Sequence, residues 1–382
     1  MKIAAWLIGA VLFGLTAFML LTAGWERPPI DSEQSGYRGT GMAEIINPRK
    51  EAALKSTQVA LEPATPLPPA TGPRAGDIYQ NVEVLGDLSV ARFTRLMQAI
   101  TTWVSPEQGC AYCHNLDNLA EDSVYTKVVA RRMLQMTQNI NGEWDDHVQQ
   151  TGVTCYTCHR GKNVPEYGWF NSDPTAEPVG GMAGWRNGQN RASPEVGLSS
   201  LPEDPFTPYI DDDQSIRVVG DTALPDGMPG ATIQSTEWSY GLMIHMSEAL
   251  GVNCTYCHNS RAFSVWNEST PQRAVSWYGL EMARALNTEY VSPLASVLPP
   301  HRLGPTGEGQ KINCTTCHQG VNKPLYGVSM VDAYPSLSTN AGSADGRRAE
   351  ASGEPAEKVE AAAELAVAEA ESSEPAQETT LQ

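Results

Sequence analysis

The chain has 382 residues, which is enough for one large domain or two smaller ones. Its formal net charge is -18, and residues 340–382 carry ten acidic and three basic side chains, so about seven of these negative charges lie in the tail. This acidic balance argues against a nucleic-acid-binding protein, but it permits a soluble partner with a basic face.

A hydrophobic segment lies at the amino terminus. Residues 4–23 contain no charged side chain and are long enough to cross a bilayer as a helix. Trp6 and Trp25 flank the segment about 28 Å apart in a helix, a distance that suits two interfacial aromatic residues. Lys2 favours an inside amino terminus, so the rest of the chain would lie outside. We expect residues 1–25 to form a retained membrane anchor. A cleaved signal peptide is the alternative, although its apolar region is normally about 7–15 residues.

Three further stretches lack a sustained hydrophobic period. Residues 26–74 are rich in proline and glycine and are expected to be extended, either as a spacer or as a segment that wraps a partner. Residues 173–208 are irregular for the same reason. Residues 350–371 contain helix-forming residues but few large apolar ones, which predicts a disordered or weakly helical tail.

The chain contains the pattern C-x-x-C-H four times, and these copies use all eight cysteines. The copies are Cys110, Cys113 and His114; Cys155, Cys158 and His159; Cys254, Cys257 and His258; and Cys314, Cys317 and His318. The pattern is the attachment signature of c-type haem, in which both thiols bond to the haem and the adjacent imidazole reaches the iron. Zinc sites or disulfides are alternatives, but neither explains why histidine follows every second cysteine. We therefore expect four covalently bound haem c groups.

Each iron needs a second ligand on its other face, and the third motif has a candidate. Met243 lies eleven residues before Cys254, about three helical turns, so the two share one helix face. A thioether opposite a histidine is a known haem pairing that raises the reduction potential. Met246 and His245 are alternatives for this role. Gly251 is predicted to end the helix before the motif.

The motifs indicate a duplication, because two segments each contain two motifs, 45 and 60 residues apart. Met97 before the first motif matches Met243 before the third, and both follow a leucine. We expect a mainly α, multihaem cytochrome c fold with two pseudo-symmetric dihaem halves, long irregular connections and one N-terminal transmembrane helix. The predicted divisions are the anchor 1–25, the extended segment 26–74, the first half 75–170, a connection 171–214, the second half 215–335 and an acidic tail 336–382.

The alignment of the two halves shows one difference between them. Helical character is predicted for residues 130–139 and 276–286. Residues 131–141 align with residues 277–287, so Met133 falls opposite Gly279. A ligand for the last haem is therefore missing at this position of the second half. One of the histidines outside the motifs could replace it, with Met282 as the competing ligand. These histidines are His147, His245 and His301.

This combination of motifs, halves and methionine spacings resembles the tetrahaem cytochrome c subunit of purple bacterial photosynthetic reaction centres. The resemblance covers about residues 75–335 and includes STPQRA (269–274) and CHQGVNKPLYG (317–327). It implies that Arg273, in STPQRA, lies beside the haem nearest the photooxidised chlorophylls. It also implies four axial pairs: Met97 with His114, Met133 with His159, Met243 with His258, and His147 with His318 across the two halves.

The resemblance implies an electron-transfer subunit and not an enzyme. Its haems would form a row, in the order third, fourth, second and first from the membrane outward, with alternating high and low potentials. Electrons would pass from a soluble periplasmic carrier, a cytochrome c or a high-potential iron-sulfur protein, to the bacteriochlorophyll pair held by the membrane subunits. The light-harvesting antenna is a further candidate partner. The protein would lie on the periplasmic face of the photosynthetic inner membrane. Many relatives carry lipid on an amino-terminal cysteine, but here the first cysteine is Cys110.

Two enzymatic alternatives conflict with the count of ligands. A membrane-anchored tetrahaem quinol dehydrogenase with two histidines on each iron would need eight histidines, and this chain has seven. A multihaem reductase needs one iron with an open position for substrate. Here the candidate ligands are enough to fill every iron, which favours electron transfer.

Overall fold

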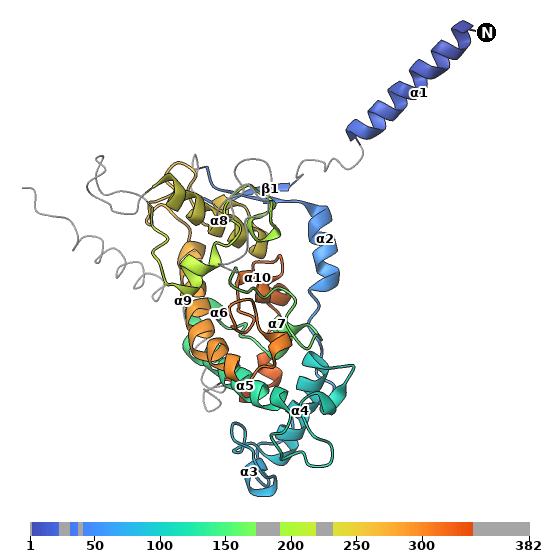
Figure 1. Cartoon of the computed structure of the whole chain (residues 1–382). Coiled ribbons are helices and arrows are strands. Elements are labelled where there is room, and N and C mark those ends of the chain that lie inside the picture. Colours follow the sequence, from blue (N-terminus) through green and yellow to red (C-terminus); the bar gives the residue numbers. More distant parts are fainter. Residues whose placement is uncertain (1, 23–30, 37–40, 173–191, 219–231, 339–382) are drawn as a thin grey trace, which may run out of the picture.

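The computed structural model describes residues 2–22, 31–36, 41–172, 192–218 and 232–338. Within these ranges the chain is mainly helical with irregular connections, as expected (Figure 1). The sheet that is described contains two short antiparallel strands, β1 (Asp31–Gln34) and β2 (Ala43–Ile46). The helices are α1 (Lys2–Thr22), α2 (Pro48–Thr57), α3 (Ala75–Ile78), α4 (Val90–Val104), α5 (Tyr125–Glu143), α6 (Asp145–Val148), α7 (Cys155–His159), α8 (Ile233–Leu250), α9 (Pro271–Leu286) and α10 (Cys314–His318). The acidic tail beyond Ser338 and most of the stretch 173–208 lie outside the described residues.

The predicted amino-terminal helix is confirmed as α1. Residues Ile3–Thr22 have a mean hydropathy of 2.3, and none of this span is buried against the rest of the described chain. Its length and composition suit a bilayer crossing, and a signal sequence would share both properties. Trp25, which the sequence placed at the far interface, lies outside the described residues.

The long helices begin and end at residues with clear local preferences. Ser89 precedes α4, and its hydroxyl oxygen accepts a hydrogen bond from the Arg92 backbone N–H at 3.4 Å, an N-terminal cap. Gly251 ends α8 with φ of 67°, a left-handed conformation that glycine adopts without steric cost. The helices predicted near residues 130–139 and 276–286 are present as α5 and α9, each longer than its predicted core.

The proline-rich segment lies along its own chain instead of extending away as a spacer. At one end, the Ala43 N–H donates to the Thr255 hydroxyl at 3.1 Å. At the other end, Arg95 Nε donates to the Thr65 carbonyl at 3.0 Å. The helix α2 between these ends was not predicted. Figure 1 shows the segment following the side of the molecule from the β1–β2 sheet to α4.

Two separate apolar clusters support the helices. The first joins α4 and α5 to the C-terminal part of the described chain, and the second joins α8 and α9 to the connection around residue 206. Their most deeply buried members include Leu96, Trp103 and Leu337 in the first cluster, and Phe206, Leu242 and Leu280 in the second. Burying one such side chain contributes about 1.5–3 kcal/mol. The first cluster therefore positions α4 and α5, the helices next to the first and second motifs. The second cluster positions α8 and α9, the helices next to the third and fourth motifs.

The elements that carry the motifs follow one another along the molecule. In Figure 1, α8, which leads into the third motif, lies near the β1–β2 sheet, and α4, which leads into the first motif, lies at the opposite end. The fourth and second motifs are α10 and α7, and they lie between these two ends.

Candidate haem sites

The first and third motifs share one local conformation. Both fold as 3₁₀ turns, Gly109–Tyr112 and Cys254–Tyr256. In each, Nδ1 of the motif histidine bonds to the carbonyl oxygen five residues further on, at 3.0 Å for His114 and 2.9 Å for His258. These carbonyls belong to Leu119 and Phe263. The carbonyl of the motif tyrosine also accepts a hydrogen bond from the hydroxyl of a threonine fourteen residues further on. These pairs are Tyr112 with Thr126 and Tyr256 with Thr270.

The second and fourth motifs share a different conformation, because each is a short α-helix. In both, the hydroxyl at the third helical position accepts the backbone N–H of the capping residue at 3.0 Å, which closes the first turn. His159 and His318 bond through Nδ1 to the carbonyl three residues further on, at 2.9 Å and 3.0 Å. The residues that end these helices, Arg160 and Gln319, are left-handed, with φ of 51° and 50°.

All four motif histidines thus use Nδ1 for a backbone carbonyl. This bond fixes the tautomer in which Nδ1 carries the proton, so the lone pair of Nε2 is available to a metal. Burial lowers the pKa values of His159 and His258, and it lowers that of His318 to about 4. Neutral imidazoles of this kind fit an iron centre.

One large cavity of about 1030 Å³ is lined by residues of both the first and the second motif. This volume is at the upper limit of the roughly 300–1,000 Å³ that is usual for the site of a single small ligand. The predicted haem residues along its wall are Met97, His114, Met133 and His159, with the thiols Cys110, Cys113, Cys155 and Cys158. The structure therefore brings the predicted ligands of the first two haems to a common cavity. This cavity can accommodate a group larger than an ordinary small ligand.

The structure also brings together His147 and His318, which are 171 residues apart in the sequence. Their ring centres are 5.8 Å apart, and the rings are inclined at 70°. Metal–imidazole bonds of about 2 Å place the centres of two opposed rings roughly 6 Å apart. His147 Nδ1 bonds to the Val275 carbonyl at 2.9 Å, and burial lowers the pKa of His147. Both rings therefore have the spacing and the protonation state that a shared iron needs.

The third site is less sharply defined. Met243 and Met246 are both half-buried against the second apolar cluster, so both remain candidates on α8. His245 faces a different part of the cluster, where Nδ1 bonds to the Glu195 carbonyl at 3.1 Å and the ring packs edge-on against Phe206. Its Nε2 is enclosed by protein and lacks a hydrogen-bond partner within the described part of the chain. His245 thus has the position of a core side chain, and burial lowers its pKa to about 4.

Arg273, in STPQRA, lies near the third motif. Its guanidinium donates to the Val265 carbonyl at 3.0 Å and to the Ser269 hydroxyl at 2.8 Å. It also stacks 4.1 Å from the centre of the Trp266 ring. Burial is the main reason that the pKa of His258 is low, and the charge of Arg273 lowers it further. Arg273 is therefore within electrostatic reach of the third motif.

The thiols of the second and fourth motifs meet in this structure. Cys158 and Cys317 form a disulfide with their Cα atoms 4.4 Å apart, whereas the other six cysteines are free. A sulfur atom in a disulfide cannot also bond to haem, so the two chemistries exclude each other at these positions. The Gln319 side-chain amide also donates to the Cys158 carbonyl at 3.4 Å. The second and fourth motifs are thus direct neighbours.

One buried amide that the sequence did not single out connects these two motifs. Gln58 follows α2, and its side chain is 4% exposed. Its Nε2 donates to the Gln319 carbonyl at 3.1 Å, and its Oε1 accepts from Arg160 Nη2 at 2.9 Å and from the Leu325 N–H at 3.1 Å. A single glutamine in a proline-rich segment carries no sequence signal for such a role.

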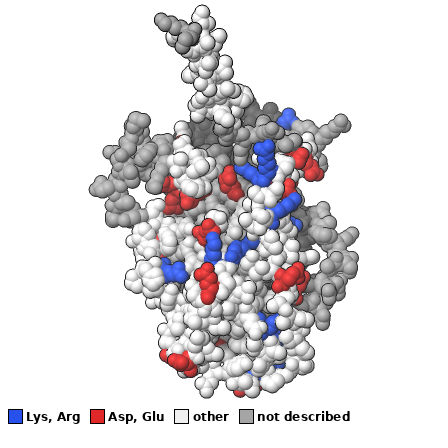
Figure 2. All heavy atoms as spheres, turned by 90° about the vertical axis from the view of Figure 1, so that its right-hand side faces the viewer, with Lys and Arg blue, Asp and Glu red and all other residues white. Residues whose placement is uncertain are grey.

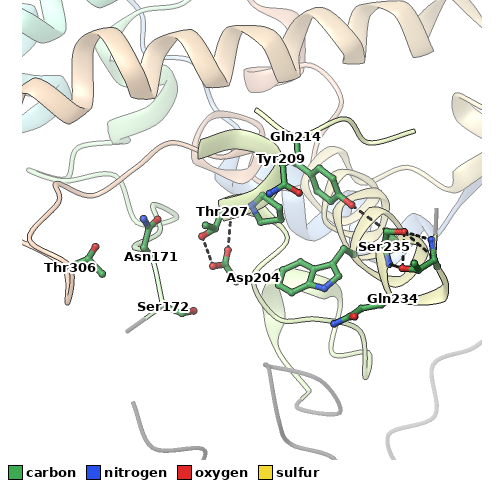
Figure 3. Close-up of a pocket in the computed structure, with 12 residues that line it drawn as sticks. Asn171, Ser172, Asp204, Thr207, Tyr209, Gln214, Gln234, Ser235 and Thr306 are labelled. Carbon is green, nitrogen blue, oxygen red and sulfur yellow. Dashed lines mark hydrogen bonds between the residues drawn. The ribbon is translucent and has the colours of Figure 1, made fainter. Parts of the chain in front are cut away.

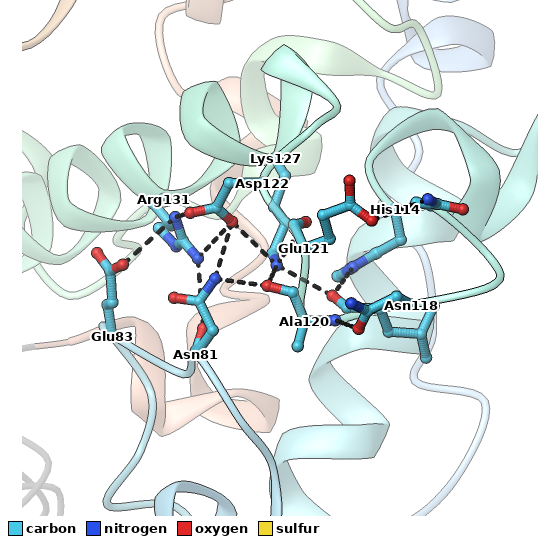
Figure 4. A network of polar contacts seen from close by, with 11 residues as sticks. Asn81, Glu83, His114, Asn118, Ala120, Glu121, Asp122, Lys127 and Arg131 are labelled. Atoms are coloured by element: carbon cyan, nitrogen blue, oxygen red, sulfur yellow. Dashed lines mark hydrogen bonds and ion pairs between the residues drawn. The ribbon is translucent and has the colours of Figure 1, made fainter.

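A second missed residue lies next to the first motif (Figure 4). Lys127 is 7% exposed, and its ammonium donates to three successive carbonyls, including Leu119 O at 3.0 Å, the same oxygen that His114 uses. Asp122 balances this charge from 3.1 Å and also pairs with Arg131 at 2.7 Å. The hydrogen bond from Arg131 holds the pKa of Asp122 well below its usual range. The loop that contains residues 119–121 therefore fixes His114 and surrounds the buried ammonium of Lys127.

A smaller pocket of about 600 Å³ lies apart from the motifs, between the connection and the start of α8 (Figure 3). Most of the residues that line it are uncharged and polar. Asp204 accepts from the Thr207 N–H at 3.1 Å, and the Tyr209 hydroxyl bonds to Ser239 at 2.9 Å. None of the four motifs contributes a residue to the lining of this pocket.

Comparison with known proteins identifies the family of this chain. The family model of the photosynthetic reaction centre cytochrome c subunit matches residues 26–338. The chain is 54% identical over 333 residues to the photosynthetic reaction center cytochrome c subunit of Rubrivivax gelatinosus, which covers 86% of this chain and 89% of that protein. It is 48% identical over 323 residues to the subunit of Thermochromatium tepidum, which covers 85% of this chain and 78% of that protein. The chain therefore belongs to the family of photosynthetic reaction centre cytochrome c subunits, which are electron-transfer proteins that carry covalently bound haem c.

Proposed function

We propose that the chain binds four haem c groups, one at each C-x-x-C-H motif, and relays electrons along them to the photooxidised bacteriochlorophyll pair. All eight cysteines would then form thioether bonds, including Cys158 and Cys317, so the disulfide would belong only to a chain without haem. The proposed axial pairs are Met97 and His114, Met133 and His159, Met243 and His258, and His147 and His318.

The observation that carries this proposal is the pair of facing imidazoles, His147 and His318. The two rings are neutral, and their centres are 5.8 Å apart. A backbone carbonyl accepts a hydrogen bond from each Nδ1, so each Nε2 keeps a lone pair that can bind a metal between the rings.

The bound haems supply the one-electron chemistry, and the protein sets their spacing and potentials. Thioether ligands at three irons and a second imidazole at the fourth would separate their potentials. The order of the motif-bearing elements in Figure 1 supports a row from the third motif through the fourth and second to the first. The matched hydrogen bonds of the first and third motifs, and of the second and fourth, support two pseudo-symmetric dihaem halves, 75–170 and 215–335.

We infer that α1 anchors the subunit at the periplasmic face of the photosynthetic inner membrane. The apolar span Ile3–Thr22 supports this anchor, and the intact mass of the mature subunit separates a retained helix from a cleaved one. The third motif would then face the membrane subunits that hold the bacteriochlorophyll pair. The light-harvesting antenna is a further candidate neighbour.

The first motif, at the opposite end, is the proposed entry point for a soluble periplasmic donor, a cytochrome c or a high-potential iron-sulfur protein. Acidic and basic side chains alternate on the face along which α2 runs, so this face has no large area of one sign (Figure 2). The salt dependence of the association rate separates a charged contact at the first motif from an apolar one.

A redox titration of the purified complex, followed by optical spectra, tests the ligand assignment. We expect four one-electron transitions, and His147→Met should raise the potential of the haem at His318 only, because a thioether donates more weakly to ferric iron than an imidazole does. Met282→Leu is the matched control. If Met282→Leu changes the spectrum of that haem and His147→Met does not, the pairing of His147 with His318 is wrong.

A further inference from the structure

The helix α9 has a glycine in its interior at a position where the corresponding helix has a methionine. Gly279 lies eight residues after Pro271, the first residue of α9, and Met133 lies eight residues after Tyr125, the first residue of α5. Glycine in a helix interior costs about 1 kcal/mol relative to alanine. Gly279 has ordinary helical geometry, since it is not among the glycines with positive φ. A glycine therefore occupies position 279 because of its small size and not because of its conformational freedom.

The space beside Gly279 is filled by the ring of His147. A Cβ atom added at Gly279 would lie 2.5 Å from His147 Cε1, 2.8 Å from Nδ1 and 3.1 Å from Nε2. Contacts below 3.0 Å are far inside van der Waals distance, so the ring would have to move. His147 belongs to the short helix α6, outside α9, and its ring reaches the surface of α9 through this notch.

A hydrogen bond fixes the ring within the notch. His147 Nδ1 bonds at 2.9 Å to the carbonyl of Val275, which lies one helical turn before Gly279. The glycine thus sets how closely the ring approaches α9, and the carbonyl sets how the ring is turned. Together they direct the ring toward His318, 5.8 Å away between ring centres.

We propose that Gly279 selects the axial ligand of the fourth haem. With no side chain at this position, α9 offers no thioether from residue 279, and it admits the imidazole of His147 from the other half. A side chain at the same position would exclude that ring, and a methionine would replace it as ligand. This inference rests on the proposed pairing of His147 with His318 and assigns Gly279 as its positioning residue.

Two substitutions in the intact, haem-loaded complex test the inference. In Gly279→Ala, the added methyl group should displace the ring, and one haem in four should lose the near-infrared magnetic circular dichroism and electron paramagnetic resonance signals of His–His ligation. In Gly279→Met, the number of Met–His haems should rise from three to four, with a higher potential at that haem alone. Gly241→Ala in α8 is the matched control, because a Cβ there meets its nearest atoms at 3.4 Å and should leave all four spectra unchanged.

Retention of the His–His signal and of an unchanged fourth potential in Gly279→Ala would overturn the inference. If Gly279→Met is too crowded to assemble, the double variant His147→Gly with Gly279→Met removes the crowding. It should again give four Met–His haems, and a fourth haem without a thioether ligand would overturn the inference. A parent protein without any His–His haem would instead overturn the ligand pairing itself, and the inference with it. The two failures are thus distinguishable in the unmodified protein.

Discussion

The two kinds of motif differ in how much of the protein surrounds them. The first and third motifs are 3₁₀ turns whose leading cysteines, Cys110 and Cys254, are exposed. The second and fourth are capped α-helices in contact with each other, and burial raises the pKa of Cys155 to about 12 and that of Cys314 to about 11. The same five-residue pattern therefore occurs in two open sites, which would lie at the ends of the proposed row, and in two enclosed sites, which would lie at its centre.

This difference suits the proposed work of each site. Open sites can exchange electrons with partners, and their potentials depend on charged side chains nearby, such as Lys127 and Arg273. Enclosed sites are shielded from solvent and depend on each other through Gln58. Substitutions at these three residues should therefore affect different haems, and each provides a test of the comparison.

The largest effect is expected from Gln58→Leu. The substitution leaves the Gln319 carbonyl, the Leu325 N–H and one Arg160 nitrogen without their partner. A buried polar group that loses its hydrogen bond costs about 1–3 kcal/mol, so we expect the free energy of unfolding to fall by about 3 kcal/mol in denaturant titrations. The spectra of the second and fourth haems should shift together.

Gln98→Leu on the exposed face of α4 is the control and should change stability by no more than about 0.5 kcal/mol. A shift of all four haem spectra in Gln58→Leu would show that the central pair is not a separate unit.

A smaller and more local effect is expected from Lys127→Met. Without the ammonium, Leu119 O accepts more strongly from His114 Nδ1, which makes the imidazole a better donor to ferric iron. The loss of a positive charge acts in the same direction. We expect the potential of the first haem to fall by about 60 mV, one decade in a one-electron equilibrium, in a redox titration.

Asp122→Asn provides the opposite change, because it removes the negative partner of Lys127 and should raise the same potential. An equal shift at the third haem in Lys127→Met would contradict local control at the end of the row.

The smallest effect is expected from Arg273→Gln. Arg273 is half-buried, so solvent screens its charge more than that of Lys127. Its loss should lower the potential of the third haem by about 30 mV, roughly threefold in the one-electron equilibrium, and leave the first unchanged. Arg273→Lys is the control that keeps the charge and loses the stacking on Trp266. If Arg273→Gln leaves the potential of the third haem unchanged, Arg273 acts only as a structural residue of its loop.

Local patterns in the sequence predicted the motifs, the helices α5 and α9 and the end of α8 at Gly251, because each depends on residues close together in the chain. The alignment of the two halves also placed Gly279 opposite Met133. The helix α2 had a readable start in Asn47 and Pro48, a favoured cap and first residue, but the surrounding proline-rich composition outweighed it. The roles of Gln58 and Lys127 were not predictable, because their partners are backbone groups that only the fold brings close.

The position of Gln58 has a consequence for biogenesis. Its hydrogen-bond partners lie 102 residues further along the chain at Arg160, 261 at Gln319 and 267 at Leu325. Contacts with such large sequence separation form late and slowly, since a long loop must close first. In the proposed topology, with α1 retained in the membrane, the part of the chain after α1 would be exported in sequence order, and this cluster could not be complete until Leu325 had been exported. The cysteines of the central motifs would then stay accessible for the proposed haem attachment until the chain is almost complete.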